Sequence, residues 1–345
     1  MRVTDWRDSA QRMASDWVAL TRWSYICEHG GVTESEPTLF DEHDSEVGVL
    51  GGIPTTVVGD LHTPGGLLAL MDLPRIGSGR AIKIAQAFGS AEALNQASPE
   101  ERRRACGVAF DEHVRVYDVE PPHESVRLLS VFDPEYPALL ADIKDRPALL
   151  WVRGALPDPA PRVAIVGTRN ATPWGSAMAA SIAEAAAEAG VSVVSGLALG
   201  IDIAAHRATI AGGGHTIAVL GSGIDRPSPK EHLAEAEEIV ESGGCLLTEQ
   251  PVGAAPSPRN LVARNRLQSG LSAATVVVQC ATKSGTMATA AAALAQGRVL
   301  AIPRPMDPNE SVLEQNLGTA RLLEDPRVLA LQARTDLDCL LRGLR

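Results

Sequence analysis

Four short segments of the chain combine small residues with cations or hydroxyl groups, a combination that suits the binding of anions. The first, Gly167–Asn170, offers a tight turn, a hydroxyl group and an arginine whose planar guanidinium can form paired hydrogen bonds with a phosphate. The second, Ser195–Asp202, contains two glycines that bracket a loop whose backbone amides can point at an anion. The first segment lacks the GxGxxG spacing of a dinucleotide-binding turn, which argues against a dinucleotide-dependent enzyme.

The other two segments add positive charge. Arg259, Arg264 and Arg266 form a dense arginine cluster in an otherwise acidic chain. A salt-bridged surface helix would explain such a cluster, but the two neighbouring glycine loops make anion binding the better interpretation. Thr282–Thr286 contains Lys283 and precedes an alanine-rich run, so it repeats the order of strand, small-residue turn and helix start. It lacks the GxxxxGK[ST] spacing of a P-loop, and ATP hydrolysis is therefore not predicted.

Other polar residues have simpler structural interpretations. Asp202 is expected to cap the helix that follows its loop, and His206 to be packed and hydrogen-bonded. The Asp-Glu-His triplets at 41–43 and 111–113 are expected to be solvated, because no metal-ligand spacing recurs around them. No Ser-His-Asp, Cys-His or paired-carboxylate arrangement stands out. The sequence therefore predicts a site that holds phosphates, with no catalytic residue, no metal and no cofactor.

The elements that position these segments follow from the hydrophobic pattern. Beyond Pro121-Pro122, runs of valine, isoleucine and leucine alternate with alanine-rich runs, which is typical of parallel strands buried between two layers of helices. In such a sheet, ligands bind at the carboxyl ends of the strands. We therefore predict an α/β fold, with an extended Rossmann-like, doubly wound and mostly parallel sheet over residues 121–335. The expected strands are 163–167, 191–196, 216–221, 245–249, 275–280 and 299–303, with 128–131 and 148–154 attached to the same sheet.

A small helical domain is expected ahead of the sheet, over residues 61–120. Two predicted helices flank a turn at Ile76–Gly79, an arrangement like that of a helix-hairpin-helix element. The amides of such a turn can hold a DNA phosphate, and Arg80 and Lys83 add positive charge nearby. A plain helical bundle uses the same kind of turn, so both interpretations stay open.

The two ends of the chain are less informative. Residues 1–60 are expected to form an N-terminal extension, with a helix over 9–28. The apolar residues after Pro326 have helical spacing, which suits packing on the core or a contribution to a dimer surface. No winged helix is expected at the C-terminal end.

Composition excludes several classes of protein. With 45% hydrophobic and 21% charged residues among 345, the chain can bury a sizeable core, and gross disorder is excluded. Aromatic residues make up only 3%, and the formal net charge of −11 argues against a surface that is basic throughout, although not against a local basic groove. The five cysteines contain no CxxC pair, which argues against a disulfide framework. Neither a signal peptide nor a membrane-spanning run is recognisable, so a cytoplasmic protein without a membrane partner is expected.

The motifs, taken in order, resemble the DprA/Smf family of DNA-processing proteins. The likeness covers roughly residues 64–325, with 64–100 matching the family's helical domain and 127–156 its entry into the extended Rossmann domain. The family commonly has a phenylalanine before its RNR motif, where this chain reads Ser257–Leu261, and it often ends its last strand with Pro-Gly. The stretches that carry the likeness are VAIVGTRNATPWG (163–175), VVSGLALGIDIAAHRATIAGGGHTIAVLGSGID (193–225), LLTEQP (246–251) and ARNRLQSG to VLAIP (263–303).

The resemblance implies a non-enzymatic homodimer that binds and protects incoming single-stranded DNA. It further implies that the protein helps to load the RecA recombinase during natural transformation and recombination. The DNA would be held by its backbone, without reading of the sequence. With the loop residues described above, the expected DNA- and phosphate-binding residues are Gly167, Thr168, Arg169, Ser195, Gly196, Arg259, Arg264, Asn265, Arg266, Lys283, Ser284, Gly285 and Thr286.

Two other functions stay open. An enzyme of the lysine-decarboxylase-like (phosphoribohydrolase) group would use a glutamate in the helix after the fourth segment, and this chain has Thr289 at that position. Hydrolysis of a nucleotide is therefore disfavoured. A sensor of small nucleotide phosphates could use the same loops without catalysis, and the sequence does not discriminate against it.

Overall fold

The computed structural model describes residues 59–158 and 160–345. The helix predicted over residues 9–28 and the triplet at 41–43 lie outside this part of the chain. The described residues belong to one compact unit.

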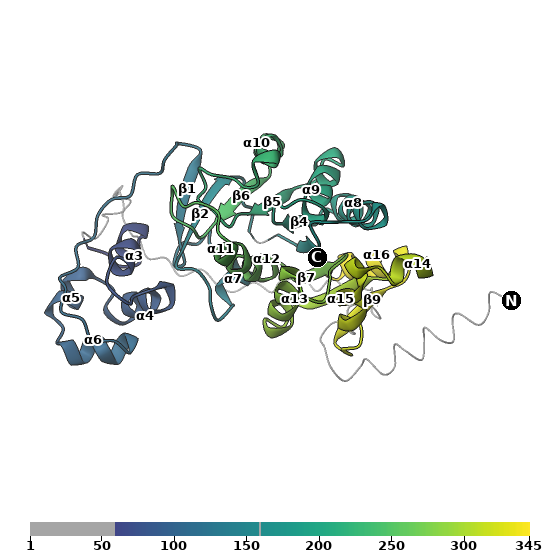
Figure 1. The fold of residues 1–345 in the computed structure, drawn as a ribbon. Coiled ribbons are helices and arrows are strands. Elements are labelled where there is room, and N and C mark those ends of the chain that lie inside the picture. Colours follow the sequence, from purple (N-terminus) through teal and green to yellow (C-terminus); the bar gives the residue numbers. More distant parts are fainter. Residues whose placement is uncertain (1–58, 159) are drawn as a thin grey trace, which may run out of the picture. The chain divides into compact units, whose positions relative to one another are not determined.

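A single nine-stranded sheet organises the larger part of this unit, in the order β1-β2-β6-β5-β4-β3-β7-β8-β9 (Figure 1). The two strands at one edge are antiparallel to their neighbours, and the other seven run parallel. The predicted Rossmann-like, mostly parallel α/β fold is therefore confirmed. The strands are β1 (Val126–Ser130), β2 (Leu149–Gly154), β3 (Arg162–Val166), β4 (Ser192–Ser195), β5 (Thr216–Val219), β6 (Cys245–Thr248), β7 (Ala274–Val277), β8 (Val299–Pro303) and β9 (Val328–Leu331).

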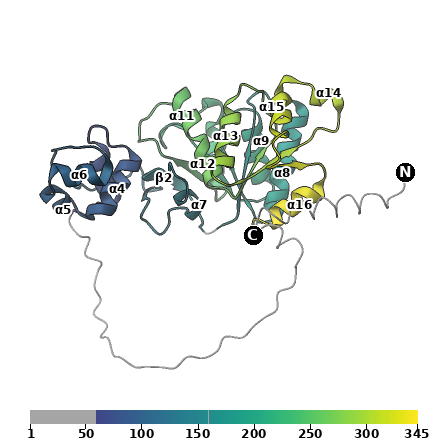
Figure 2. The ribbon, with the colours of Figure 1, turned by 90° about the horizontal axis from the view of Figure 1, so that it is seen from below.

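Helices cover both faces of the sheet because each parallel strand needs a crossover to reach the next one. Helices α8 (Pro173–Glu188), α9 (Ile201–Ala211) and α10 (Leu233–Glu241) lie on one face, and α12 (Asn265–Gly270), α13 (Gly285–Ala295) and α15 (Glu314–Leu322) lie on the other (Figures 1 and 2). The remaining helices are α7 (Ala138–Ala141), α11 (Pro258–Ala263), α14 (Pro308–Ser311) and α16 (Arg334–Arg342), with a 3-10 turn at Lys230–His232.

The sheet is buried on both faces, as its near-continuous apolar strands require. One core cluster joins the strands to α7, α12 and α13, and includes Leu140, Leu267 and Ala290. A second cluster, which includes Ile203 and Ile239, packs α9 and α10 on the opposite face. The small side chains of the alanine-rich helices let them lie close to the strands.

The strand order reverses between β3 and β7, and this reversal positions the site. From β3 the sheet continues through β4, β5 and β6 on one side, and through β7, β8 and β9 on the other. The crossovers on the two sides therefore leave in opposite directions, and a crevice opens at the carboxyl ends of β3 and β7. The first and fourth glycine-containing segments follow these two strands.

Four short helices precede the sheet: α3 (Pro64–Met71), α4 (Ser78–Phe88), α5 (Ala91–Gln96) and α6 (Pro99–Cys106). Residues 72–77 connect α3 to α4, so the turn predicted at 76–79 is only partly correct: Ser78 and Gly79 already belong to α4. Arg102 is buried among these helices, and its guanidinium donates hydrogen bonds of 3.1 to 3.2 Å to the carbonyl oxygens of residues 94, 95, 110 and 112. Because its guanidinium is engaged by these carbonyl groups, Arg102 is not available to bind a ligand.

The segment after Pro326 differs from its predicted helical pattern. Residues Val328–Leu331 form an edge strand that pairs with β8, and only Arg334–Arg342 is helical. Leu337, Leu340 and Leu341 of this helix are buried, which agrees with the first of the two interpretations, packing on the core. None of the helices within residues 59–158 and 160–345 is both long and apolar enough to cross a membrane.

Candidate functional site

The loops that follow β3 and β7 are joined directly. The Thr168 amide donates a 2.8 Å hydrogen bond to the carbonyl oxygen of Gln279, and Thr286 Oγ1 donates one of 3.1 Å to the carbonyl oxygen of Gly167. A side chain at Gly167 would place its Cβ 2.4 Å from Ile201 and 2.9 Å from the Gln279 carbonyl, so only glycine fits there. The start of α13 is thereby held beside the turn after β3.

The loop after β4 is held in a strained conformation. Leu197 has a φ of 65°, which is uncommon for a residue with a side chain, and its carbonyl oxygen lies 2.8 Å from Nδ1 of the buried His232. Gly200 has a φ of 79°, and a Cβ there would lie 2.3 Å from the Thr168 carbonyl oxygen. That carbonyl also accepts the Ile201 amide at 3.2 Å. The loops after β3 and β4 are therefore packed together through their backbones.

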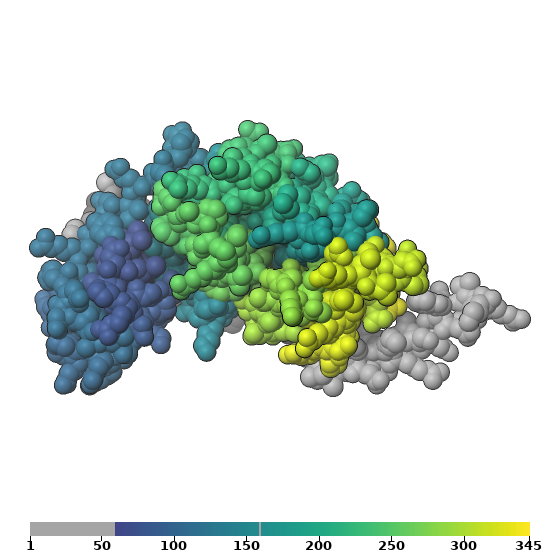
Figure 3. All heavy atoms as spheres, in the orientation of Figure 1, coloured from purple at the N-terminus to yellow at the C-terminus, as the bar shows by residue number. Residues whose placement is uncertain are grey.

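A cleft of about 450 Å³ opens where these loops meet α11, α12 and α13. A smaller pocket of about 90 Å³ adjoins it and shares residues with it. On the face drawn in Figure 3, teal and green residues of the sheet-containing part both reach the surface. The cleft is lined by Val166, Gly167, Thr168, Arg169, Ala198, Asp202, Pro258, Leu261, Val262, Arg264, Asn265, Gln268, Ser284, Gly285, Thr286 and Thr289.

Arg169 is the cation best placed to meet a ligand. Its side chain is exposed and lines both the cleft and the smaller pocket. Within residues 59–158 and 160–345 it forms no ion pair or hydrogen bond through its guanidinium. Lys283 and Arg259 are also exposed, but neither lines the cleft. Among the described residues, the Arg169 guanidinium is therefore available to a ligand at the switch point of the sheet, where the strand order reverses between β3 and β7. It lies next to the first turns of α9 and α13, whose helix dipoles favour an anion.

Arg264 has a different environment, because it is only 4% exposed. Its Nη1 donates a 2.7 Å hydrogen bond to the Val219 carbonyl, and its Nη2 lies 3.8 Å from Asp202 Oδ2. Burial lowers the pKa of the Arg264 guanidinium, and Asp202 opposes that shift. A Cβ at Gly196 would lie 1.7 Å from Arg264 Nη1, so Gly196 makes room for this side chain. Arg264 therefore ties the ends of β4 and β5 to α9.

Asp202 is the carboxylate that pairs with the buried Arg264. It lies in the first turn of α9. The N-cap of this helix is Gly200, so the prediction that Asp202 caps the helix is wrong. The Ala198 amide donates to Asp202 Oδ2 at 3.4 Å. Burial raises the pKa of Asp202, and Arg264 opposes that shift.

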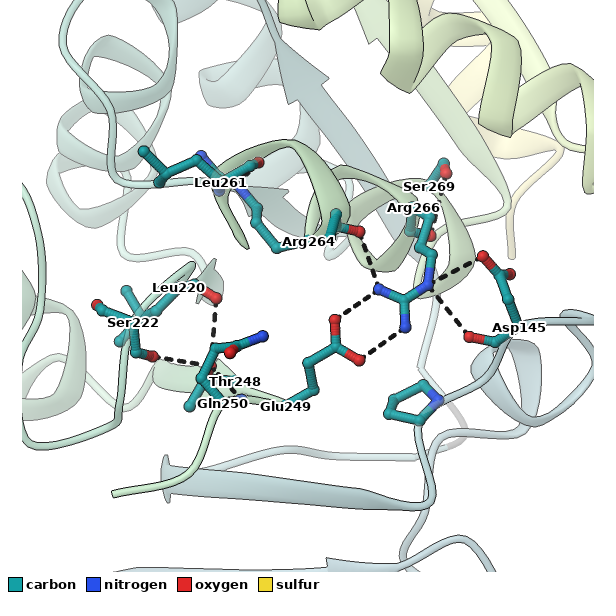
Figure 4. A network of polar contacts seen from close by, with 12 residues as sticks. Asp145, Leu220, Ser222, Thr248, Glu249, Gln250, Leu261, Arg264, Arg266 and Ser269 are labelled. Atoms are coloured by element: carbon teal, nitrogen blue, oxygen red, sulfur yellow. Dashed lines mark hydrogen bonds and ion pairs between the residues drawn. The ribbon is translucent and has the colours of Figure 1, made fainter. Parts of the chain in front are cut away.

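Arg266 is not among the residues that line the cleft. Its Nη1 and Nη2 each donate a 2.6 Å hydrogen bond to the carboxylate of Glu249, and its Nε lies 3.0 Å from Asp145 Oδ2 (Figure 4). This bidentate pair connects α12 to the end of β6 and to the segment before β2. Direct contact of Arg264 and Arg266 with DNA stays a prediction, while their internal bonds favour a positioning role for both.

The remaining predicted residues are divided between the interior and the cleft. Ser195 is buried, and its hydroxyl donates a 2.6 Å hydrogen bond to the Ile165 carbonyl. Asn265 lines the cleft and donates from Nδ2 to the Gly285 carbonyl at 3.1 Å. Ser284 is the N-cap residue of α13, so it stands with Gly285 and Thr286 at the cleft wall.

Three aliphatic residues at this site were not among the predicted binding residues. Leu261 and Val262 line the cleft, and Leu199 lines the smaller pocket together with Leu261. Leu199 is 47% exposed and Val262 is 51% exposed. In sequence they look like ordinary apolar positions of a loop and a helix. Only the fold brings the loop after β4 next to α11, so no local signal could have joined them.

His206, in α9, is buried, and its Nδ1 lies 2.8 Å from Thr216 Oγ1, which confirms the expected packed and hydrogen-bonded histidine. Residues 111–113 belong to no such cluster: among residues 59–158 and 160–345, no group of three or more His, Cys, Asp or Glu side chains lies close enough together to hold a metal ion.

The burial of His206 predicts a pH-dependent stability. Burial, with smaller effects of Arg264 and His232, lowers the pKa of His206 from 6.5 to about 3. Between pH 6.5 and about 3, the His206 imidazole is protonated in the unfolded chain but neutral in the folded chain. The stabilisation is therefore complete above pH 6.5 and is lost as the pH falls toward 3, by up to about 1.4 kcal/mol per pH unit.

Urea denaturation at several pH values below neutrality checks this dependence. We expect His206→Gln to flatten the loss of stability on acidification, whereas His123→Gln, at an exposed histidine, should leave it as in the wild type. An unchanged pH dependence in His206→Gln would contradict the assignment.

Comparison with known proteins places this geometry in a family. The model of the DNA recombination-mediator protein A family matches residues 127–335. Protein Smf of Escherichia coli is 39% identical over 189 residues, which are 54% of this chain and 50% of that protein. This chain spans about half the length of the first curated relatives it matches.

Solved structures agree with the family model. A structure of DNA processing protein A from Helicobacter pylori, which concerns its single-stranded DNA binding mode, is 29% identical with a TM-score of 0.56 and covers 64% of this chain and 97% of that chain. The DprA structure from Streptococcus pneumoniae is 26% identical with a TM-score of 0.64 and covers 80% of this chain and 96% of that chain. The chain therefore belongs to the DNA recombination-mediator protein A family, the DprA/Smf family of DNA-processing proteins.

Proposed function

We propose that the chain binds single-stranded DNA in the cleft at the switch point of its sheet. The observation that carries this proposal is the exposed Arg169 guanidinium, which has no hydrogen bond or ion pair with the described residues and lines the cleft beside the N-terminal turns of α9 and α13. A guanidinium fork and helix N-termini both hold phosphate oxygens without distinguishing bases. The site is therefore suited to a DNA backbone of any sequence.

The net negative charge of the chain favours binding of single-stranded DNA over binding of duplex DNA. With a formal net charge of −11, most of the surface repels a polyanion, and only a flexible strand can bring its phosphates into a recessed cationic cleft. A duplex holds its phosphates on a stiff cylinder that cannot bend into a cleft of about 450 Å³. The relative from Helicobacter pylori, whose structure concerns single-stranded DNA binding, supports the same choice.

The predicted residues divide into two roles in this proposal. Arg169, the turn of Gly167 and Thr168, and the α13 segment Ser284–Thr286 meet the strand inside the cleft. Lys283 and Arg259 are exposed and adjoin the cleft-lining residues Ser284 and Pro258 in sequence, and they would extend the cationic path. The other members hold these loops in place: Ser195, Gly196, Arg264, Asn265 and Arg266.

The finer functions follow from family membership. We infer that the protein protects incoming single-stranded DNA, helps to load a RecA-type recombinase during transformation, and acts in the cytoplasm as a homodimer. We also infer a binding protein that is not an enzyme. In support of this, Thr289 lines the cleft where a phosphoribohydrolase would need its glutamate, and the one carboxylate that lines the cleft, Asp202, faces Arg264.

Fluorescence anisotropy with a labelled oligo-dT tests the proposal. Unlabelled single strand should compete efficiently, whereas duplex DNA of the same length and free mononucleotides should compete poorly. Tight binding of a mononucleotide would instead favour the nucleotide-phosphate sensor. Equal competition by duplex DNA would contradict selection for a flexible strand.

A further inference from the structure

The backbone of the loop between β3 and α8 sets the position of Arg169. The Arg169 side chain is exposed, and its guanidinium forms no hydrogen bond or ion pair with the described residues. No polar side-chain contact therefore fixes the direction in which the guanidinium leaves the loop. The groups that hold residues 167–172 in place decide whether it meets a phosphate in the cleft.

Gln279, which follows β7, holds this loop at both ends. Its backbone carbonyl accepts the Thr168 amide at 2.8 Å, and its side-chain Oε1 accepts the Thr172 amide at 3.0 Å. Gln279 is fully buried, and a Cβ at Gly175 would lie 1.9 Å from Oε1, so the first turn of α8 leaves room for the amide group. A single residue thus fixes the backbone on either side of Arg169.

Glu310, in the short helix α14, determines which way the Gln279 amide faces. Gln279 Nε2 donates to Glu310 Oε1 at 2.9 Å, and Thr172 Oγ1 donates to the same oxygen at 2.6 Å. A carboxylate offers only acceptors, so it binds the NH2 end of the amide and leaves Oε1 for the Thr172 amide. The buried Asn316 donates from Nδ2 to the Glu310 carbonyl at 2.8 Å and thereby holds α14 beside this network.

We propose that Gln279 and Glu310 are positioning residues for DNA binding, which act by holding the Arg169 loop in its binding conformation. The proposal rests on the proposed function and adds a supporting network to its site. Neither residue lines either chamber of the site, the cleft or the smaller pocket, so their effect on the bound strand is indirect.

The sign of the effect distinguishes positioning from simple electrostatics. Removal of the Glu310 carboxylate makes the protein less negative, and this change alone would strengthen binding to a polyanion. Loss of the hydrogen bonds that orient Gln279 would instead release the Arg169 loop and weaken binding. We therefore expect lower DNA affinity from a variant that has one negative charge less.

Fluorescence anisotropy with the labelled oligo-dT, in the wild-type and Arg169→Ala backgrounds, tests this assignment. Glu310→Ala should weaken binding roughly threefold to tenfold in the wild-type background, as is usual for residues coupled through one network. In the Arg169→Ala background it should change binding by less than about twofold, because the group that it positions is gone. A residue with a merely structural role would weaken binding equally in both backgrounds.

Exchange of the two side chains provides a second test, which holds even where Glu310→Ala fails to fold. Gln279→Glu alone places two carboxylates against each other and should weaken oligo-dT binding at least as much as Glu310→Ala. Addition of Glu310→Gln restores one carboxylate and one amide of nearly the same sizes. The double variant should therefore bind within about twofold of the wild type.

Glu314→Ala is the matched control, since Glu314 is an exposed glutamate of α15 that lines neither chamber. It removes the same charge and should keep the wild-type affinity or raise it slightly. Equal losses in the two backgrounds, tighter binding by Glu310→Ala, or no recovery in the exchange variant would overturn the positioning role. Failure of the wild type to bind oligo-dT, or full binding by Arg169→Ala, would instead overturn the proposed function.

Discussion

Replacing Arg169 with alanine is expected to weaken the binding of a short oligo-dT about tenfold to a hundredfold at low salt. The side chain is exposed, lines both chambers of the site and forms no internal ion pair with the described residues. Its loss therefore removes a charge-assisted phosphate contact, worth about 1.5–3 kcal/mol, but no ion pair or hydrogen bond among the described residues. Affinity should fall while the melting temperature stays the same.

The salt dependence separates this effect from a general loss of structure. Each phosphate contact of a single strand contributes about 0.7 to the slope of log affinity against log salt concentration, so Arg169→Ala should make that slope shallower by about 0.7. Arg169→Lys keeps the charge but loses the planar fork, and it should bind with intermediate affinity.

Arg342→Ala is the matched control, because Arg342 is an exposed arginine of α16 that lines neither chamber. This variant should keep both the affinity and the slope of the wild type. Unchanged binding by Arg169→Ala would contradict the cleft as the place where DNA is held.

The sheet could be predicted from the sequence because its strands are buried on both faces. Continuous runs such as those at 163–166 and 275–278 cannot be amphipathic helices, and the glycine turns after them locate the carboxyl ends. The edge strand β9 was missed for the opposite reason. It is four residues long and leads into a helix almost at once, so its apolar positions merge with the helical pattern of α16. Only its pairing with β8 distinguishes it.

The location of the site could also be predicted, but not the use of each cation. Arg169, Arg264 and Arg266 look equivalent in sequence, since all follow or adjoin a predicted strand-end loop. What separates them is the set of groups that the fold brings to each guanidinium: Glu249 and Asp145 to Arg266, Asp202 and the Val219 carbonyl to Arg264. These partners come from other strands and helices. Their distances from the arginines depend on strand order, which a single sequence does not reveal.

Replacing Arg264 with alanine is expected to destabilise the fold by about 3–5 kcal/mol, the range seen when one partner of a buried ion pair is removed. The variant would leave Asp202 buried without its cation and the Val219 carbonyl without its donor. Next to the small Gly196, it would also leave a void. Thermal melting should show a large drop for Arg264→Ala and none for Arg169→Ala, although both residues line the same cleft.

A double-mutant cycle with Asp202 tests whether the two groups act as a pair. Removing both charges should cost less than the sum of the single variants, because the double variant leaves no unpaired charge in the interior. DNA binding supplies the second distinction. Arg264→Ala should lower affinity through displaced loops while the salt slope of the remaining complex stays near that of the wild type. A wild-type melting temperature in Arg264→Ala, together with a slope shallower by one phosphate, would instead make Arg264 a direct DNA contact and contradict its positioning role.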